Sequence, residues 1–270
     1  MVANHNIIAQ NCNYKMRPQD SRTIVTGAMV LAGRPLTAAQ LIRLTEPLGL
    51  SSSNLKSHLT RMVREGTVTR AGPARLAVYR PSPAQQMVIA GIDARLAETR
   101  HRTWDGKWLT LLLWLPRNRS NRNRLRAMLW FDGFRPLGAH AFARPAWPLP
   151  WAGHRARDYA AQFGGFCSVG RFIAGVEMLD SLYDLDGLDR EARRVNAWIR
   201  RRTTRATSPR AAFALQMEVG GRVAQLIGHD PRLPPELWGR RRGIAQAIAA
   251  FRRFEERIAP HAQRFLDGCA

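Results

Sequence analysis

Hydrogen-bonding and cationic side chains at helical spacing in residues 51–64 could bind DNA. Arginine can donate paired hydrogen bonds to guanine, lysine meets phosphates, and serine or threonine hydroxyls reach either. One side of the segment carries such residues, which are Ser52, Ser53, Lys56, Ser57, Thr60, Arg61 and Arg64. The residue types and their spacing therefore predict a helix whose exposed face contacts a DNA duplex.

The alternative is an ordinary helical pair whose basic side chains form a solvated face. The charge of the chain favours DNA, because 42 lysine and arginine residues stand against 20 aspartate and glutamate residues, which gives a formal net charge of +22. A chain this basic attracts polyanions by fast, salt-sensitive association. Nearly all the cations are arginines, which genomes rich in G and C also favour. Charge alone does not separate DNA from RNA or from an acidic membrane.

The elements around this segment must position it. Its other side carries an apolar stripe, formed by Leu55, Leu59, Met62 and Val63. Ser51 can cap the start of the helix by accepting a backbone N–H bond, and Gly66 fits the left-handed position past its end. A short apolar helix over residues 38–48 precedes it across a tight turn, and a first helix over residues 21–33 would pack behind the pair.

A hairpin follows the basic helix. Two short β-like runs, residues 67–71 and 76–80, are joined by a Gly-Pro turn. Arg70 and Arg75 of this hairpin would add phosphate or minor-groove contacts. Helix, tight turn, basic helix and hairpin together predict a winged helix-turn-helix, in which the second helix lies in the DNA major groove.

The remainder of the chain predicts an α+β protein with two further parts. The middle alternates strand and helix in a way that fits a small ferredoxin-like sandwich for dimerisation or sensing, and the C-terminal third is typical of helices. The expected boundaries are a disordered or flexible extension over residues 1–20, a winged helix over 21–82, a connecting helix over 83–103, the ferredoxin-like domain over 104–178 and a helical C-terminal domain over 179–270.

Signatures of enzymes, metal sites and membrane spans are weak or missing in the sequence. Cys12, Cys167 and Cys269 are odd in number and far apart, so they predict neither a zinc site nor a disulfide framework. There is no GxSxG, P-loop or HExxH pattern. The apolar run at residues 109–115 is far shorter than the ~20 residues of a membrane helix. We therefore expect a cytoplasmic protein that is not an enzyme and has no cofactor, metal or membrane partner.

Four segments, in order along the chain, resemble the phenylacetate-degradation repressor family, the PaaX-type transcriptional regulators. They are LTAAQLIRLTEPLGLSSSNLKSHLTRMVREG at 36–66, WDGKW at 104–108 with the run that follows it, YDLDGL at 183–188 and DPRLPPEL at 230–237. Three places depart from the family pattern. Residues 1–20 extend beyond the usual start, and Trp238-Gly239-Arg240 stands where the family has a Trp-Pro-Gly step. The wing hairpin carries Pro73 and Ala74 in place of a denser basic run.

The resemblance implies a function as well as a domain order. It implies a winged helix, a ferredoxin-like middle and a helical C-terminal domain. It also implies a homodimer that binds a double-stranded DNA operator and is released by a small aromatic acid or acyl-CoA effector. The expected function is therefore that of a transcriptional regulator, a repressor of an aromatic-compound catabolic operon.

Tryptophan and arginine residues of the middle domain are candidates for contact with such an effector. Trp147 and Trp151 flank prolines in one loop, and Arg144 stands just before them. Indoles can stack on an aromatic ring while arginine meets a carboxylate. The alternative is a loop whose indoles cover the edge of the core. The effector site could instead lie between the middle and C-terminal domains, near Trp108 and Arg222.

The competing function is a nucleic-acid-processing enzyme built on the ferredoxin-like domain. The middle of the chain also resembles a small CRISPR-associated endonuclease, which needs an aspartate at the end of its first strand. This chain has Trp114 in that stretch, within Leu-Trp-Leu-Pro. A hard divalent cation takes oxygen ligands and an indole supplies none, so we expect no nuclease activity.

Overall fold

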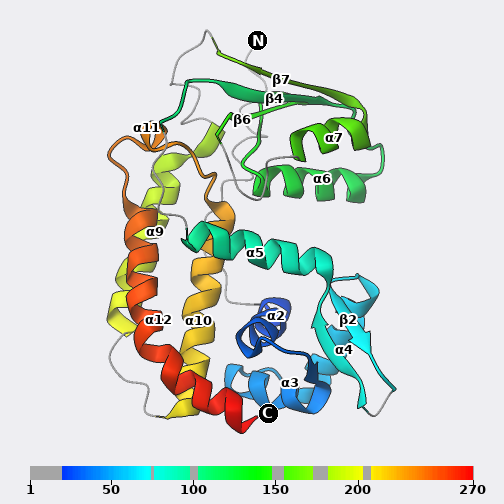
Figure 1. Cartoon of the computed structure of the whole chain (residues 1–270), viewed down its shortest axis with the longest axis vertical. Helices are drawn as coiled ribbons and strands as arrows, with labels where there is room; N and C mark the ends of the chain where they lie inside the picture. Colours follow the sequence, from blue (N-terminus) through cyan, green and yellow to red (C-terminus); the bar gives the residue numbers. More distant parts are fainter. Residues whose placement is uncertain are drawn as a thin grey trace. The chain divides into compact units, whose positions relative to one another are not determined.

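The computed structural model describes residues 20–73, 76–97, 103–147, 155–172, 182–202 and 208–269. The chain divides into two compact units, and each holds one antiparallel sheet (Figure 1). The first, called the three-stranded unit here, comprises Met16–Leu96, Arg193–Gln225 and Ala245–Ala270. The second, called the four-stranded unit, includes Ala97–Ala192 and Leu226–Ile244.

The three-stranded unit begins with two capped helices. Helix α2, Ser21–Ala32, starts at Asp20, whose side chain accepts a hydrogen bond from the Thr23 N–H at 2.8 Å. Helix α3, Ala38–Thr45, starts with a reciprocal capping box between Thr37 and Gln40. The predicted helix over 38–48 ends as a 3₁₀ turn, η1 at Glu46–Leu48, because Pro47 has no N–H for an α-helical bond.

Helix α4 and a small sheet complete the N-terminal part of this unit. Helix α4 spans Ser52–Arg64 and packs with α2 and α3. The sheet has the order β1-β3-β2, from Leu36–Thr37, Val78–Pro81 and Val68–Ala71. The predicted hairpin is confirmed, but its second strand starts two residues late. Leu76 still belongs to the turn, where its N–H donates to the Pro73 carbonyl at 2.9 Å, and it is 71% exposed.

Helix α5, Pro83–Ala97, is the predicted connecting helix. The sequence predicts that Met87, Ile89, Ile92 and Leu96 form the apolar side of this helix. Ile89, Ile92 and Leu96 are half-buried, as predicted, but Met87 is 60% exposed. At 100° per residue, Met87 lies about 170° from the direction that Ile89, Ile92 and Leu96 share. It is therefore on the opposite, solvent-facing side of the helix.

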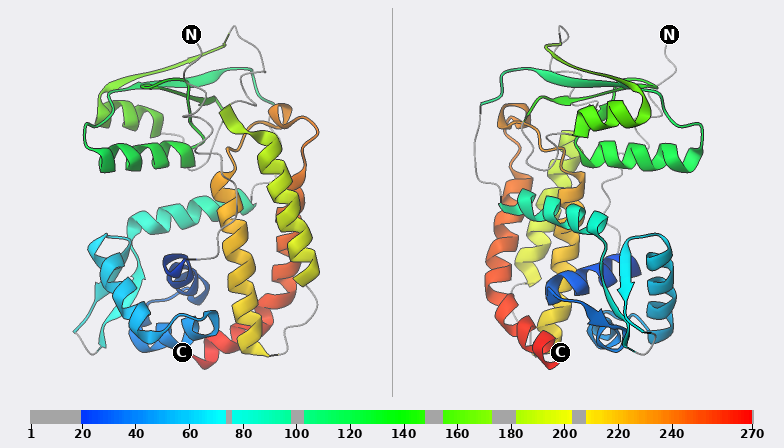
Figure 2. Two further views of the ribbon diagram at one scale, coloured as in Figure 1. Left: turned by 180° about the vertical axis from the view of Figure 1, so that it is seen from behind. Right: turned by 45° about the vertical axis from the view of Figure 1, so that its right-hand side comes forward.

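Long helices fill the C-terminal part of the chain. They are α9 at Leu185–Arg202, α10 at Pro209–His229 and α12 at Gly243–Gly268, with the short α11 at Pro235–Trp238. The three long helices run side by side in both views of Figure 2. Each contributes residues to both units, so these helices do not separate from the rest as a unit of their own.

The four-stranded unit follows the order strand, helix, two strands, helix, strand. Its elements are β4 at Trp108–Leu113, α6 at Arg119–Phe131, β5 at Arg135–Pro136, β6 at Ala141–Pro145, α7 at Arg155–Phe163 and β7 at Gly165–Gly170. The strands lie in the order β5-β6-β4-β7, and all neighbours are antiparallel. The mixture of helices and antiparallel sheets confirms the α+β class.

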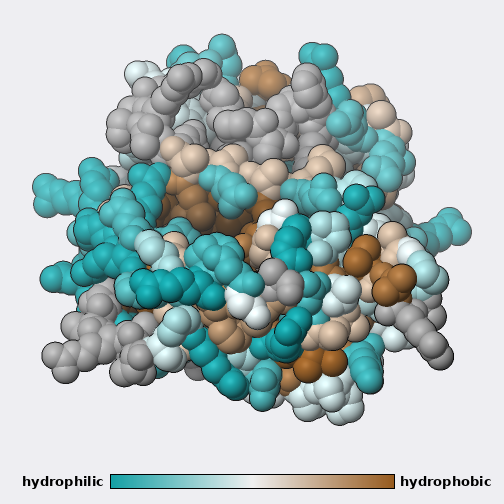
Figure 3. Space-filling model, turned by 60° about the horizontal axis from the view of Figure 1, so that its bottom comes forward, coloured by the Kyte–Doolittle hydropathy of each residue, from teal (hydrophilic) through white to brown (hydrophobic). Residues whose placement is uncertain are grey.

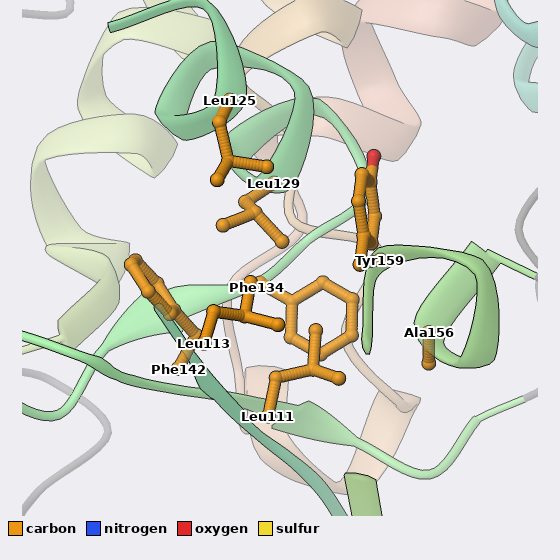
Figure 4. Packing of buried hydrophobic residues seen from close by; sticks show 8 residues of the cluster. All are labelled: Leu111, Leu113, Leu125, Leu129, Phe134, Phe142, Ala156 and Tyr159. Atoms are coloured by element: carbon orange, nitrogen blue, oxygen red, sulfur yellow. The ribbon is translucent and has the colours of Figure 1, made fainter. Parts of the chain in front are cut away.

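Two buried apolar clusters form the core of this unit. One contains Trp108 of β4 and Ala143 of β6 with residues after the sheet, and the other lies between the sheet and helices α6 and α7. Figure 4 shows Leu125 and Leu129 of α6 directed toward the same cluster as Leu111 and Leu113 of β4, and Tyr159 of α7 completes it. The helical spacing also predicts that Met128 points inward with Leu125 and Leu129, but Met128 is 37% exposed. Four large apolar side chains remain exposed on or beside β4 and β7, and they are Leu112, Trp114, Phe166 and Val169.

Candidate nucleic-acid interface

Both ends of α4 are fixed by local sequence. The Ser51 side chain accepts a hydrogen bond from the Asn54 N–H at 3.3 Å, as the sequence predicts. After Glu65 the chain turns at Gly66, whose φ of 71° lies in the left-handed region that favours glycine. These ends set which residues of the helix face inward and which face solvent.

The two sides of α4 have opposite character. Leu55, Leu59 and Met62 are buried, at 0%, 2% and 1% exposure. The seven residues predicted to meet DNA are all exposed: Ser52, Ser53, Lys56, Ser57, Thr60, Arg61 and Arg64. The structure thus brings this set to one solvent-facing surface, called the α4 face here, and their contact with DNA remains a prediction.

Hydrogen bonds within the α4 face already use some of the donors that its residues could direct to DNA. The Thr60 hydroxyl donates to the Lys56 carbonyl at 3.0 Å, so toward a ligand it is mainly an acceptor. An Nη of Arg61 lies 3.0 Å from Nδ1 of His58, which sequence reasoning did not include. Arg61 and Arg64 stand in the last turn, where a cation interacts favourably with the helix dipole.

The hairpin adds cations beside α4. Arg70 is exposed and lies opposite Tyr79 in the sheet register. Arg75 lies outside the described residues. Arg80 was not among the predicted contacts, yet it is exposed, and its Nε donates to the Thr69 hydroxyl at 3.3 Å. In the register Arg80 lies opposite Thr69, so it is on the other face of the sheet from Arg70. Its charge at the end of the second predicted run was the available signal.

Several other basic residues of this unit already have protein partners. Arg22 of α2 forms an ion pair with Glu65 at the end of α4. Arg43 donates to the carbonyl of Cys269 at 3.2 Å, and Arg210 lies 3.6 Å from Glu46. Hydrophilic residues cover most of the face drawn in Figure 3, with apolar residues between them. The net charge is therefore not a uniform measure of the surface available to DNA.

The expected effector residues lie in different surroundings. Trp108 is buried, and its ring lies 5.8 Å from that of Trp104 and 5.3 Å from that of Phe172. Trp147 is also buried, and Trp151 lies outside the described residues. Arg222 belongs to the three-stranded unit, where its guanidinium lies 4.1 Å from the centre of the Trp198 ring. The described members of this set are thus packed against other side chains.

Arg144 belongs to a buried polar cluster that sequence reasoning missed. It is 6% exposed, and an Nη donates to the Trp147 carbonyl at 3.1 Å. Burial lowers the pKa of Arg144, and the nearby Asp132 raises it. Asp132 in turn accepts a hydrogen bond of 2.7 Å from the Tyr159 hydroxyl. An acid at the C-terminal end of α6, which the helix dipole disfavours, was the available signal for a buried partner.

The described part of the chain offers little for other chemistry. Within it, no three His, Cys, Asp or Glu side chains gather as a metal site would need. Trp114, in the stretch where the nuclease alternative requires an acid, is 62% exposed and contacts Phe166 with ring centres 5.9 Å apart. None of the described helices combines the length and apolar character that a membrane crossing needs.

Comparisons with known proteins match both ends of the chain. A family model described as PaaX-like protein matches residues 23–84, and one described as PaaX-like protein C-terminal domain matches residues 185–268. Together they cover more than half of the chain. No curated protein matches.

A solved structure is similar over most of the chain. It is the uncharacterized protein Rv0674 from Mycobacterium tuberculosis, with 24% identity and a TM-score of 0.56, covering 91% of this chain and 98% of that one. At this identity the similarity concerns the fold alone.

Proposed function

The chain belongs to the PaaX-like family, known as regulators of transcription, and from that premise we propose that it is a homodimeric, sequence-specific DNA-binding repressor. The observation that carries the proposal is the α4 face. Its seven polar and basic residues are exposed on a helix whose opposite side is buried. The major groove of DNA is wide enough for one α-helix, so the polar and basic side chains of the α4 face could contact the base edges of an operator there.

The arrangement around α4 supports a winged helix-turn-helix. Helices α2, α3 and α4 pack together beside the β1-β3-β2 sheet, and the exposed Arg70 and Arg80 lie on its β2–β3 hairpin. In this class the hairpin follows the recognition helix and contacts the backbone or minor groove. We likewise propose a ferredoxin-like arrangement for the four-stranded unit, because two strand-helix-strand halves with antiparallel neighbours match it.

A dimer would double the α4 face and recognise an inverted repeat. The exposed Leu112, Trp114 and Phe166 are the residues that favour a contact between copies, since clustered large apolar side chains in water mark interaction sites. The apolar cluster belongs to the four-stranded unit, and α4 belongs to the three-stranded unit. Half-sites are expected about 10 base pairs apart, centre to centre, or a multiple of that.

The effector part of the proposal rests on the family. A small aromatic acid or its coenzyme A thioester would release the operator, provided that it binds the free state more tightly than the DNA-bound state. For Trp108 or Arg144 to touch such a ligand, their present packing would have to open, since both are more than nine-tenths buried.

Selection of binding sites from random duplexes, followed by band-shift titration, tests the DNA-binding proposal. We expect one enriched inverted repeat, and a loss of affinity of at least about tenfold in Lys56→Ala/Arg61→Ala. The matched control is Arg124→Ala/Arg126→Ala, which removes two exposed charges from α6. Equal losses in the two variants, or no enriched sequence, would mean that binding is non-specific or absent.

A further inference from the structure

A cavity inside the three-stranded unit belongs to none of the sites described above. It has a volume of about 430 Å³, and residues of α2, α5, α10 and α12 line it. Most of its wall is apolar, from Leu31, Ile89, Ile92, Leu96, Met217 and Phe251. Pockets for small organic ligands have volumes of about 300–1,000 Å³ and walls of this kind.

Three glycines line the cavity. Gly27, Gly220 and Gly221 lie in its wall. At Gly27 an added Cβ would lie 2.9 Å from the end of the Met217 side chain, so α2 and α10 approach each other closely there. At Gly220 an added Cβ would meet nothing within 4 Å, which is the space that a ligand can use.

The charged groups of the cavity are mostly acidic. Among the described residues that line it, the carboxylates are Asp93 and Glu255, and the cation is Arg22, which is already paired with Glu65. Burial raises the pKa of Glu255, the Gln216 amide lowers it, and repulsion from Asp93 raises it again. Burial also raises the pKa of Asp93. Both carboxylates line the same cavity, where Glu255 is half-buried and Asp93 is exposed.

We propose that this cavity binds a small organic cation, with its apolar body between α2, α5 and α10 and its ammonium group at Asp93 and Glu255. A cation there removes the repulsion between the carboxylates and replaces the water that burial takes from Glu255. An organic anion would meet the same carboxylates with the wrong sign. The ligand class therefore differs in charge from the aromatic acid of the proposed function, and the site does not depend on that function.

Three probes of similar shape test the charge requirement on the full chain. They are 2-phenylethylamine, the neutral 2-phenylethanol and the anionic 3-phenylpropionate, each titrated by calorimetry and by thermal shift. We expect the amine to bind and raise the melting temperature, the alcohol to bind about tenfold or more weakly, and the acid not to bind. Equal binding of amine and acid, tighter binding of the acid, or no binding of the amine at millimolar concentration would overturn the proposal.

Two pairs of variants locate the site. Glu255→Gln keeps the shape and removes the charge, so amine affinity should fall about tenfold, whereas the exposed neighbour Glu256→Gln should leave it unchanged. Gly220→Leu should fill the cavity and abolish binding, while Gly228→Leu, on the same helix outside the lining, should not. Leucine favours a helix over glycine, which helps both variants to fold. Unchanged amine binding in Glu255→Gln and Gly220→Leu would contradict the site.

Discussion

The arginines of α4 and those of the four-stranded unit show one residue type in two roles. Arg61 and Arg64 are exposed at the end of a helix, with their charge toward solvent. Arg135 and Arg144 are 1% and 6% exposed and donate to backbone carbonyls inside the unit. The number of cations therefore predicts DNA binding only when the exposed arginines are counted apart from the buried ones.

The difference between these regions has energetic consequences. An exposed cation contributes little to folding, because water and salt screen its interactions, and it is available to a polyanion. A buried guanidinium has lost its water, so each hydrogen bond and each nearby carboxylate matters to stability. Substitutions should therefore affect DNA binding in one region and the free energy of unfolding in the other.

The largest effect is expected at Asp132, in the buried cluster. Asp132→Ala should lower the free energy of unfolding by about 3–5 kcal/mol, because it leaves the Tyr159 hydroxyl and the Arg144 charge without their carboxylate. Urea denaturation of the variant and of the unmodified protein measures this change in the free energy of unfolding. The matched control is Asp158→Ala, an exposed acid on α7, which should change stability by less than about 0.5 kcal/mol. Similar, small losses in the two variants would show that the cluster does not stabilise the unit.

An intermediate effect is expected on the α4 face, in binding and not in stability. If Arg61 donates to a guanine edge, Arg61→Ala should cost about 1–3 kcal/mol at the operator and relax specificity at one position. If Lys56 meets a phosphate, Lys56→Ala should weaken all sequences alike and reduce the salt slope by about 1. Band-shift titrations at several salt concentrations separate the two roles. If either variant instead lost much of its free energy of unfolding, the substituted residue would be stabilising the fold, as the buried arginines do.

Local rules predicted the α4 region well. The Ser51 cap, the buried stripe at Leu55, Leu59 and Met62, and the turn at Gly66 all follow from neighbours within a few residues, and the structure confirms them. The hairpin also follows from local turn chemistry, although its second strand begins later than expected.

Non-local contacts explain what the sequence did not reveal. The hydrogen bond between Tyr159 and Asp132 joins residues 27 positions apart in the sequence. The hydrogen bond from Arg43 to the Cys269 carbonyl joins residues 226 positions apart. Periodicity carries no information on such pairs. It also fails at Met128, because a position at the edge of an apolar stripe can be open or covered, depending on what packs beside it. Met87 lies on the opposite side of α5 from Ile89, Ile92 and Leu96, so the predicted apolar side was too wide there. The cavity has the same origin, since it exists only where four helices from distant parts of the chain meet.

The smallest effect is expected at Arg222, whose burial is intermediate between that of the exposed and that of the buried arginines. It is half-buried, and its guanidinium lies 4.1 Å from the centre of the Trp198 ring. Arg222→Met keeps an apolar stem and removes the cation–π contact, so we expect a loss of about 0.5–1 kcal/mol in the free energy of unfolding.

A double-mutant cycle with Trp198→Leu isolates that contact from the loss of packing. Arg202 also lies over the Trp198 ring, at 5.0 Å, so Arg202→Met serves as the control for a more distant cation on the same indole. A coupling free energy near zero for Arg222 and Trp198, together with weaker binding of an aromatic acid to Arg222→Met, would identify Arg222 as a ligand contact. A measurable coupling with unchanged ligand binding would assign it to the fold, together with Arg144.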